Sequence, residues 1–264
     1  MTTLSSYLAI ARNASRWTTI AAKAPDVATQ TRYFQDNIGK VTSAEELVNN
    51  SRLFTYAMKA FGLGDRAYAK GLMKQVLQQG VGSSTTLAYK LNDPNILAFA
   101  KVFDFARNGA QTTQSASLAK SVVDQYTQNA LETGQSSQNA GVGLALYFQR
   151  KAPSIASVYG ILADRKLLQV VQTALNIPAA TAVMPIDSQA AMLTKRLDLS
   201  DFKDAAKLQN FIARFAAQYD ARYGDASATG SVYSNAILLG ASQDTGGGLG
   251  ASLLQAMQAY RANT

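Results

Sequence analysis

Apolar residues recur with helical spacing in two stretches of the chain that lie 114 positions apart. In both stretches the intervals between apolar positions are one, three, three and one, the pattern of a helix with one buried face. The tripeptide Tyr33-Phe34-Gln35 recurs at the same offset as Tyr147-Phe148-Gln149. We therefore predict one amphipathic helix in two copies, built on these pairs of positions: Leu53 and Leu167, Phe54 and Leu168, Ala57 and Val171, Ala60 and Ala174, Phe61 and Leu175.

The residues that flank this helix also correspond between the copies. Asn50 and Asp164 stand just before the apolar stripe, where a short polar side chain accepts a hydrogen bond from an unpaired backbone N–H. Gly62 and Asn176 stand just after it, and these residue types best adopt the left-handed conformation that ends a helix. Pro178 then prevents continuation of the second copy. The pattern predicts the same start and stop in both copies.

A second pair of helices follows in each copy. Leu87 and Leu91 match Leu193 and Leu197 at an offset of 106, so the first copy has about eight extra residues, which we place at 80–84. Asn92-Asp93-Pro94 predicts a capped helix that runs to about Arg107, and the matching helix is expected to begin near Asp204. Their apolar positions correspond at an offset of 112: Ile96 and Leu208, Phe99 and Phe211, Ala100 and Ile212, Phe103 and Phe215.

These elements predict an all-α fold, a duplicated helical bundle of two similar halves with an irregular C-terminal tail. Residues 1–112 form the first helical repeat and residues 113–225 the second, with 108–114 as the linker. Residues 1–32 are expected to be a helical approach to the first repeat. Residues 226–264 are a Ser/Gly-rich tail that ends in a short amphipathic helix carrying Leu253, Leu254, Met257 and Tyr260. No alternating strand pattern exceeds four residues.

Composition narrows the chemistry that this fold can carry. The 264 residues include no histidine and no cysteine, which excludes Ser-His-Asp and Cys-His nucleophiles, Cys/His zinc sites, haem and iron–sulfur ligation, and disulfides. Carboxylate, Lys, Tyr or Ser chemistry and oxygen-ligated Mg²⁺ or Ca²⁺ remain open. We expect no Sec signal peptide in residues 1–16 and no membrane span, because no stretch approaches 18 consecutive apolar residues.

The formal net charge of +8 raises the alternative of a nucleic-acid-binding or regulatory protein. The basic residues are spread along the chain, with pairs at Arg150-Lys151, Arg165-Lys166 and Lys195-Arg196. We interpret them mainly as solvated helix faces and do not expect nucleic acid as the partner. Whether the pairs form a functional patch stays open.

Four local patterns resemble chemical sites, and each has a structural interpretation that we favour. Ser117-Leu118-Ala119-Lys120 matches S-x-x-K by chance, with Ser117 near a helix start and Lys120 solvated. The glycine-rich segment 246–250 is a linker, because no strand precedes it and no Lys-Ser/Thr follows. Ser43 and Glu46 form a capping box. Asp198, Asp201 and Asp204 lie three residues apart but serve capping and solubility.

Six phenylalanines at helical spacing are expected in the core and not as stacking platforms for bases. They are Phe54, Phe61, Phe99, Phe103, Phe211 and Phe215. We therefore predict no catalytic residue, no cofactor-binding residue and no metal ligand, and we expect no enzymatic activity.

Several segments in order resemble the bacterial domain of unknown function 1217. They cover most of residues 33–220, at 47–53, 60–63, 68–70, 91–94 and 99–100 in the first half and at 145–153, 161–164, 186–187 and 214–220 in the second. Proteins of this kind are encoded in alphaproteobacteria, often beside flagellar genes. The resemblance implies an all-helical duplicated fold and a role in the flagellum and motility, and it carries over no catalytic residues.

We therefore expect a non-enzymatic structural or accessory protein of the flagellum that acts by protein–protein contacts. One version is an exported component, made in the cytoplasm and passed unfolded through a channel by a route other than Sec, which the Cys-free composition suits. The other version is a cytoplasmic assembly factor. The sequence does not decide between these versions, nor does it give the partner, the interaction surface or the oligomeric state, so a homo-oligomer stays open.

Overall fold

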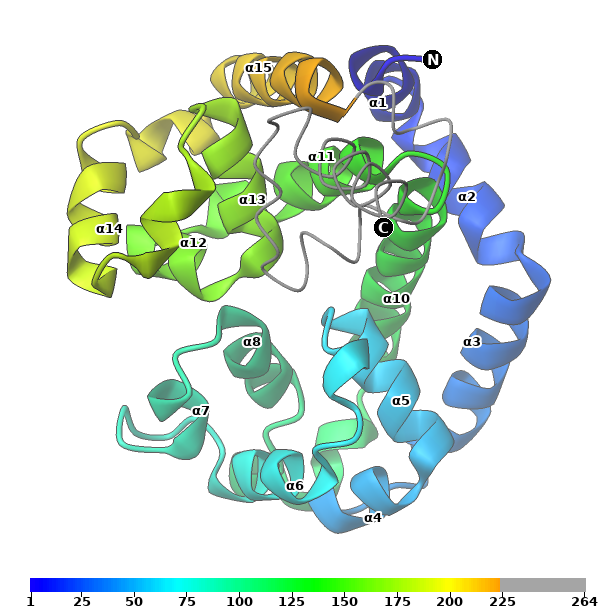
Figure 1. The fold of residues 1–264 in the computed structure, drawn as a ribbon. Helices are drawn as coiled ribbons and strands as arrows, with labels where there is room; N and C mark the ends of the chain where they lie inside the picture. The colour runs from blue at the N-terminus through cyan, green and yellow to red at the C-terminus, as the bar shows by residue number, and fades with distance from the viewer. Residues whose placement is uncertain (224–264) are drawn as a thin grey trace, which may run out of the picture. The chain divides into compact units, whose positions relative to one another are not determined.

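The computed structural model describes residues 1–223, and all of the regular structure in that range is helical, which confirms the predicted all-α fold (Figure 1). The predicted tail at 226–264 lies outside the described residues. The α-helices are α1 (Thr3–Ala11), α2 (Ala14–Lys23), α3 (Pro25–Ile38), α4 (Ala44–Asn49), α5 (Ser51–Ala60), α6 (Lys70–Gln79), α7 (Leu87–Lys90), α8 (Pro94–Val102), α9 (Phe105–Asn108), α10 (Ala116–Ser136), α11 (Ala140–Lys151), α12 (Val158–Ala163), α13 (Arg165–Ala174), α14 (Ile186–Thr194) and α15 (Ala205–Tyr223). Short 3-10 helices occupy η1 (Gly64–Arg66), η2 (Gly109–Thr113), η3 (Ala152–Ser154), η4 (Ala179–Val183) and η5 (Leu199–Lys203).

The paired helices α5 and α13 begin at the predicted caps. Asn50 Oδ1 accepts a hydrogen bond from the backbone N–H of Leu53 at 3.1 Å. Asp164 Oδ1 accepts two, from Lys166 N at 3.0 Å and from Leu167 N at 3.1 Å. Each bond satisfies a donor that the first turn of a helix leaves without an intrahelical partner. Both helices span ten residues.

The same two helices also end alike. Gly62 has φ of 76° and Asn176 has φ of 50°, so both adopt the predicted left-handed conformation. The next backbone N–H, of Leu63 and of Ile177, donates to a carbonyl five residues earlier, at 2.8 Å in each case. This bond closes the last turn of the helix in both halves. The predicted starts and stops are confirmed, while the duplication itself stays a prediction.

The helix after Asp93 is shorter than the sequence predicts. Asp93 caps α8 and Pro94 is its first residue, as expected, but α8 ends at Val102 and not near Arg107. The backbone turns at Phe103, which is buried, and the side chain of Asp104 then accepts from Arg107 N and caps the separate helix α9. Asp104 thus separates α8 from α9, although the apolar positions of the sequence continue through both helices.

The segment 108–114, which we predict as a linker, packs into the structure. Most of it forms η2, and the side chains of Thr112 and Thr113 are buried. The Thr113 hydroxyl donates to the carbonyl of Val41, and the Thr112 hydroxyl donates to the carbonyl of Gly109 at 2.8 Å. The hydroxyl groups thus satisfy carbonyls that the irregular backbone leaves unpaired, and the polar segment remains buried.

The buried apolar residues form two clusters. The first core gathers residues between Val27 and Tyr126, and the second gathers Tyr7 and Ile10 of α1 with residues between Leu131 and Phe215. All six phenylalanines predicted for the core are buried there. The long helix α10 contributes Leu118 and Val122 to the first core and Leu131 to the second, and it contacts both α5 and α11 (Figure 1).

The described residues belong to one compact unit, and both cores lie inside it. The predicted repeat boundaries at 112/113 and 225/226 are based on the similarity of the two sequence repeats. Core membership does not test them, so they stay a prediction. Within residues 1–223 no helix is both long enough and apolar enough to cross a membrane.

Candidate functional site

Six polar or charged side chains meet where α8 of the first half approaches helices of the second half, and we call them the junction cluster. Its members come from α8, α10, α11 and the N-cap of α13: Asn95, Glu132, Tyr147, Arg150, Lys151 and Asp164. Asn95, Glu132, Tyr147 and Asp164 are each less than a tenth exposed. Buried polar groups of this kind must find partners within the protein.

Asp164 organises the cluster because its two carboxylate oxygens serve different purposes. Oδ1 caps α13, whereas Oδ2 accepts from the hydroxyl of Tyr147 and from Nδ2 of Asn95, the latter at 3.1 Å. A carboxylate accepts at up to about four positions, so one side chain can fulfil both roles. The residue that starts a helix therefore also joins that helix to α8 and α11.

Asn95 carries the contact from the first half. Its Nδ2 donates to Asp164 and to the Tyr147 hydroxyl, the second at 3.2 Å, and its Oδ1 accepts from Lys151 Nζ at 2.8 Å. One amide from α8 thus bonds three side chains of the other half. The backbone N–H of Asn95 is itself bound by Asp93 Oδ1 at 2.8 Å, which fixes the start of α8.

Glu132 and Arg150 form a two-pronged ion pair at the edge of the cluster. Arg150 Nε donates to Glu132 Oε1, and its Nη2 donates to Oε2 at 2.7 Å. The Glu132 side chain is 5% exposed and that of Arg150 is 20% exposed. The parallel geometry of the two bonds suits a carboxylate and a guanidinium, and it ties α10 to α11.

Burial shifts two proton equilibria in the cluster. The pKa of Lys151 is lowered to about 8, mainly because the ammonium is removed from water and also because the positive charge of Arg150 is nearby. The pKa of Tyr147 is raised far above the ordinary tyrosine value of 10.0, mainly by burial and also by the charge of Asp164 and the hydrogen bond to it. The lysine is therefore the group of this pair that titrates in a moderate pH range.

A lysine of lowered pKa four residues from a tyrosine hydroxyl resembles an acid–base pair, but the hydrogen bonds argue for a different role. Tyr147 donates its hydroxyl proton to Asp164, and Lys151 donates to Asn95. Both groups thus point at partners inside the protein. We interpret the junction cluster as a structural connection between the halves.

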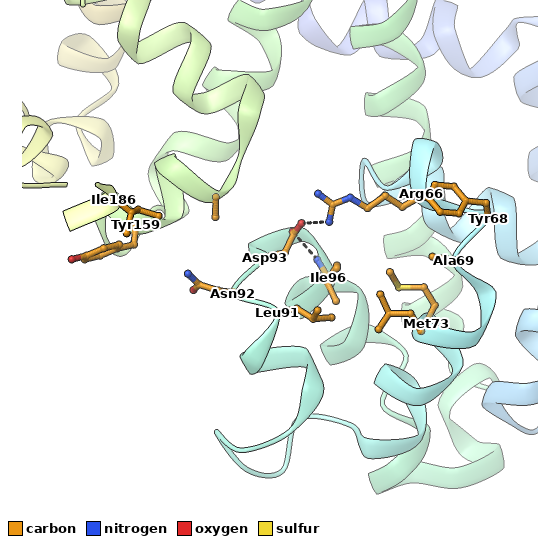
Figure 2. Close-up of a pocket in the computed structure, with 12 residues that line it drawn as sticks. Arg66, Tyr68, Ala69, Met73, Leu91, Asn92, Asp93, Ile96, Tyr159 and Ile186 are labelled. Atoms are coloured by element: carbon orange, nitrogen blue, oxygen red, sulfur yellow. Dashed lines mark hydrogen bonds and ion pairs between the residues drawn. The ribbon is translucent and has the colours of Figure 1, made fainter. Parts of the chain in front are cut away.

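A cleft with a volume of about 350 Å³ lies beside the cluster, and we call it the junction cleft. Arg66 Nη1 donates to Asp93 Oδ2 in its wall, and the same Asp93 caps α8 (Figure 2). The cleft has contributions from both halves. Its lining residues are Arg66, Tyr68, Ala69, Leu72, Met73, Leu91, Asn92, Asp93, Ile96, Tyr159, Ala163 and Ile186.

Sequence reasoning missed the junction cluster, although part of its signal is visible in the repeated tripeptide. In the first half Asn50 Nδ2 donates to the Tyr33 hydroxyl at 3.4 Å, and in the second half the Tyr147 hydroxyl donates to Asp164 Oδ2. The tyrosine and the cap are 17 residues apart in both cases. We call each arrangement a tyrosine–cap module. A cap that recurs with its tyrosine at fixed spacing could have been recognised as a contact.

A cation also lies over the tyrosine ring in each module. Arg52 stands two residues after the cap in the first half, with its Cζ 3.9 Å from the centre of the Tyr33 ring. Lys166 occupies the same position in the second half, with its Nζ 4.9 Å from the centre of the Tyr147 ring. The two modules therefore have a tyrosine, a cap and a cation at equivalent positions.

The basic pair Arg150-Lys151 corrects one expectation. We predict mainly solvated basic faces, but Arg150 binds Glu132 and Lys151 binds Asn95 within the cluster. A partner approaching from solvent does not meet these two charges as an open patch. Lys195 and Arg196, in contrast, are exposed.

The residues singled out in the sequence lie apart from the cluster. Ser117 is in the first turn of α10, and Lys120 is exposed and pairs with Asp124 at 2.6 Å, as the structural interpretation predicts. In the capping box Ser43 Oγ accepts from Glu46 N at 3.2 Å. The Glu46 carboxylate reaches back one residue farther than expected, to Thr42 N at 2.7 Å.

The three aspartates near η5 are used separately. Asp198 caps η5 by accepting from Ser200 N at 2.8 Å, and Asp204 caps α15 by accepting from Ala206 N at 2.9 Å. Asp201 pairs with Lys207 Nζ at 2.6 Å. Among residues 1–223 no group of three or more acidic side chains is placed to hold a metal ion. The glycine-rich segment 246–250 lies outside the described residues.

Comparisons with known proteins agree with the fold. A family model described as "Protein of unknown function (DUF1217)" matches residues 60–208. The chain is similar to an X-ray crystal structure of a structural genomics target from Agrobacterium tumefaciens, with 36% sequence identity and a TM-score of 0.78. The match covers 83% of this chain and 94% of that one. No curated protein matches the sequence.

Proposed function

This chain belongs to the DUF1217 family, whose function is unknown, and from that premise we propose that it is a non-enzymatic structural or accessory protein of the bacterial flagellum that acts by protein–protein contacts. The flagellar setting rests on the family resemblance of the sequence. The solved relative in Agrobacterium tumefaciens supports a bacterial setting.

The observation that carries the non-enzymatic part is the hydrogen bonding of the junction cluster. This is the site where buried titratable groups gather and where the pKa of a lysine is lowered, so it is the first place to look for catalysis. Its lysine, tyrosine and carboxylates bond to one another and to Asn95. Groups with these bonds hold helices in place, which favours a scaffold.

A clean deletion strain tests the proposal. We expect reduced swimming in soft agar and missing or malformed flagella in electron micrographs, both restored by the wild-type gene. Normal motility together with normal flagella would overturn the flagellar role. An allele carrying Lys151→Met distinguishes a scaffold from an enzyme. A scaffold that still folds should restore motility without the Lys151 amine, whereas an enzyme that uses this amine should not.

Cell fractionation separates the exported component from the assembly factor. The exported version predicts the protein in the medium or in purified flagella. Protein found only in the cytoplasm of cells with intact flagella rejects export and leaves the assembly factor.

Nucleic-acid binding is the alternative, and the net charge of +8 favours it. It predicts affinity for DNA or RNA that falls steeply with salt. The burial of Arg150-Lys151 removes one of the three basic pairs on which the alternative depends. An absence of binding at low salt would reject it.

A further inference from the structure

Large apolar side chains are exposed around the junction cleft. Tyr68 is 84% exposed and Ile186 is 55% exposed, and both line the cleft together with the less exposed Leu72 and Tyr159. Tyr68 and Leu72 come from the first half, whereas Tyr159 and Ile186 come from the second (Figure 2). Single exposed apolar side chains are ordinary, but a group of them around one hollow is typical of an interaction surface.

The exposed apolar surface continues along the chain from Ile186. Val183 and Met184, just before it, are 89% and 37% exposed, and residues 177–186 include no charged residue. At roughly 200 Å² for a fully exposed large side chain, these two and the four that line the cleft together offer roughly 700 Å². Each partner in a stable interface of standard size contributes roughly 800 Å². The apolar surface therefore comes close to the size that a stable complex needs.

The surface combines a projection with a hollow. Tyr68 is exposed over most of its side chain, whereas Met73 and Ile96 at the floor of the cleft are buried in the first core. The cleft has a volume of about 350 Å³ and so has room for one or two large apolar side chains. Interfaces concentrate their binding energy where an aromatic side chain fills such a pocket.

The charges that line the cleft cancel. Arg66 and Asp93 are its two charged lining residues, and Arg66 Nη1 donates to Asp93 Oδ2. Lys74, next to Met73 in the chain, pairs with Glu45 at 3.3 Å. The other charged residues that are adjacent in the chain to lining residues and not buried carry two charges of each sign, and they are Asp65, Asp187, Lys70 and Lys90.

This balance favours a second copy of the chain as the occupant. In a two-fold contact the same surface meets itself, so any excess of one sign on that surface would repel its own image. The chain as a whole carries +8, which opposes self-association elsewhere, but the charges at the cleft are balanced. A surface without net charge also gives no electrostatic attraction to a strongly acidic partner or to nucleic acid.

The shape agrees with the charges. A two-fold contact requires a surface that is complementary to itself, and a projection beside a hollow meets that requirement. Each copy then supplies one projection and one hollow, and two identical contacts form at once.

We propose that the junction cleft is the contact surface of a two-fold symmetric dimer, in which Tyr68 of each copy enters the cleft of the other and packs against Ile186 there. This inference goes beyond the proposed function, because it concerns the chain itself and does not depend on a flagellar role.

Analytical ultracentrifugation of the full-length protein tests the proposal over a range of concentrations. We expect a dimer whose dissociation constant is unchanged or lower at high salt, because salt screens the repulsion between two copies of +8. A protein that stays monomeric at roughly 100 μM, or a dimer that dissociates as salt is raised, would overturn the proposal.

Single substitutions locate the contact. Tyr68→Glu and Ile186→Lys should each raise the dissociation constant by at least about tenfold, since each places an unpaired charge in the apolar contact twice. Both side chains are exposed, so the fold should survive, and far-UV circular dichroism checks this. Ile20→Lys is the matched control, because Ile20 is 51% exposed and lines the other large cleft, and it should leave the dimer intact.

Mixing the two variants tests the pairing itself. A dimer of one Tyr68→Glu copy with one Ile186→Lys copy has opposite charges at one contact and the wild-type residues at the other. The mixture should therefore dimerise at least about tenfold more tightly than either variant alone. No gain on mixing would overturn the two-fold arrangement, and a dimer lost with Ile20→Lys alone would assign the contact to the other cleft.

The outcomes for the dimer and for the flagellar role are separate. Normal motility on deletion rejects the flagellar function and leaves the dimer to be judged by sedimentation. A monomeric protein whose deletion abolishes motility rejects the dimer alone.

Discussion

The two tyrosine–cap modules are built alike but lie in different surroundings. In the first, the half-buried Tyr33 and Asn50 are neutral, and their contact at 3.4 Å is long. In the second, Tyr147 and Asp164 are 3% and 6% exposed, the cap is charged, and the hydroxyl donates to it. The tyrosine–cap module is therefore a partly solvated helix cap in the first half and part of a buried hydrogen-bond network in the second.

The difference shows how a capping residue acquires a long-range role. Asn95 reaches Asp164 from a helix 69 residues away in the sequence, and Lys151 joins through Asn95. At the position equivalent to Lys151 the first half has Asn37, whose amide bonds to the backbone of its own helix at 2.8 Å. A charged cap, Asp164 in place of Asn50, and a partner from the other half, Asn95, together turn a local cap into a connection between the halves.

The largest difference is expected for removal of the caps. Asp164→Ala leaves Tyr147, Asn95 and the start of α13 without their acceptor, and we expect a loss of about 3–5 kcal/mol of unfolding free energy. Asn50→Ala removes one cap bond near solvent and should cost about 1 kcal/mol. Urea unfolding followed by far-UV circular dichroism measures both. Asp164→Asn, which keeps an acceptor oxygen, is the control and should fall between them.

The next effect is a pH dependence that only the second module should show. The pKa of Lys151 is about 8 in the folded protein and 10.5 ordinarily, so between pH 8 and pH 10 the unfolded chain binds a proton that the folded chain has released. The unfolding free energy should therefore rise with pH in that window, by less than about 1.4 kcal/mol per pH unit. Urea unfolding across this range measures the rise.

Lys151→Met is the control for this window, and it should flatten the rise while the neighbouring Arg150, Asp164, Glu132 and Asp93 remain. Above pH 10 the trend should reverse, because tyrosines ionise in the unfolded chain while burial keeps Tyr147 protonated in the folded one. An unchanged pH profile in the Lys151→Met protein would contradict the assignment.

Substitution at the helix ends should affect both halves equally. Gly62→Ala places a side chain at φ of 76° with open space around it, so the cost comes from the backbone alone, at about 1 kcal/mol. Asn176→Ala should cost a similar amount, and Asn176→Gly should cost less. Thermal unfolding compares the three, and a tolerated alanine at either position would show that the left-handed turn is not required.

The smallest effects are expected for the cations over the tyrosine rings. Arg52→Ala should cost about 0.5–1 kcal/mol, since the guanidinium lies close to Tyr33 and also donates to Gln30 at 2.8 Å. Lys166→Ala should cost less, because its ammonium lies farther from the ring. Double-mutant cycles with Tyr33→Leu and Tyr147→Leu isolate the ring contribution, and a zero coupling energy in both would remove the cations from the module.

The sequence predicts those parts of the fold that depend on near neighbours. Asn50, Asp164, Asp93 and Asp204 are recognisable as caps because a cap acts on the next two or three residues. The left-handed Gly62 is recognisable for the same reason. The all-α fold and the buried phenylalanines follow from the helical spacing of apolar residues.

The candidate site depends on distant partners, and the sequence says little about those. Glu132 and Arg150 belong to different helices, and Asn95 meets Asp164 only because the start of α8 comes close to the start of α13. A basic pair in a helix looks the same in sequence whether it faces solvent or a buried glutamate. The early end of α8 at Val102 also depends on the packing of Phe103 and on the capping side chain of Asp104.

The passage of α10 through both cores has a consequence for the motions of the molecule. Its 21 residues form one uninterrupted helix, with Val122 in the first core and Leu131 in the second. An opening of either core that unfolds α10 breaks hydrogen bonds of a helix that also packs in the other core, so such an opening affects both halves. The backbone amide protons near Thr127, between the two cores, should then exchange with solvent only when the whole unit opens.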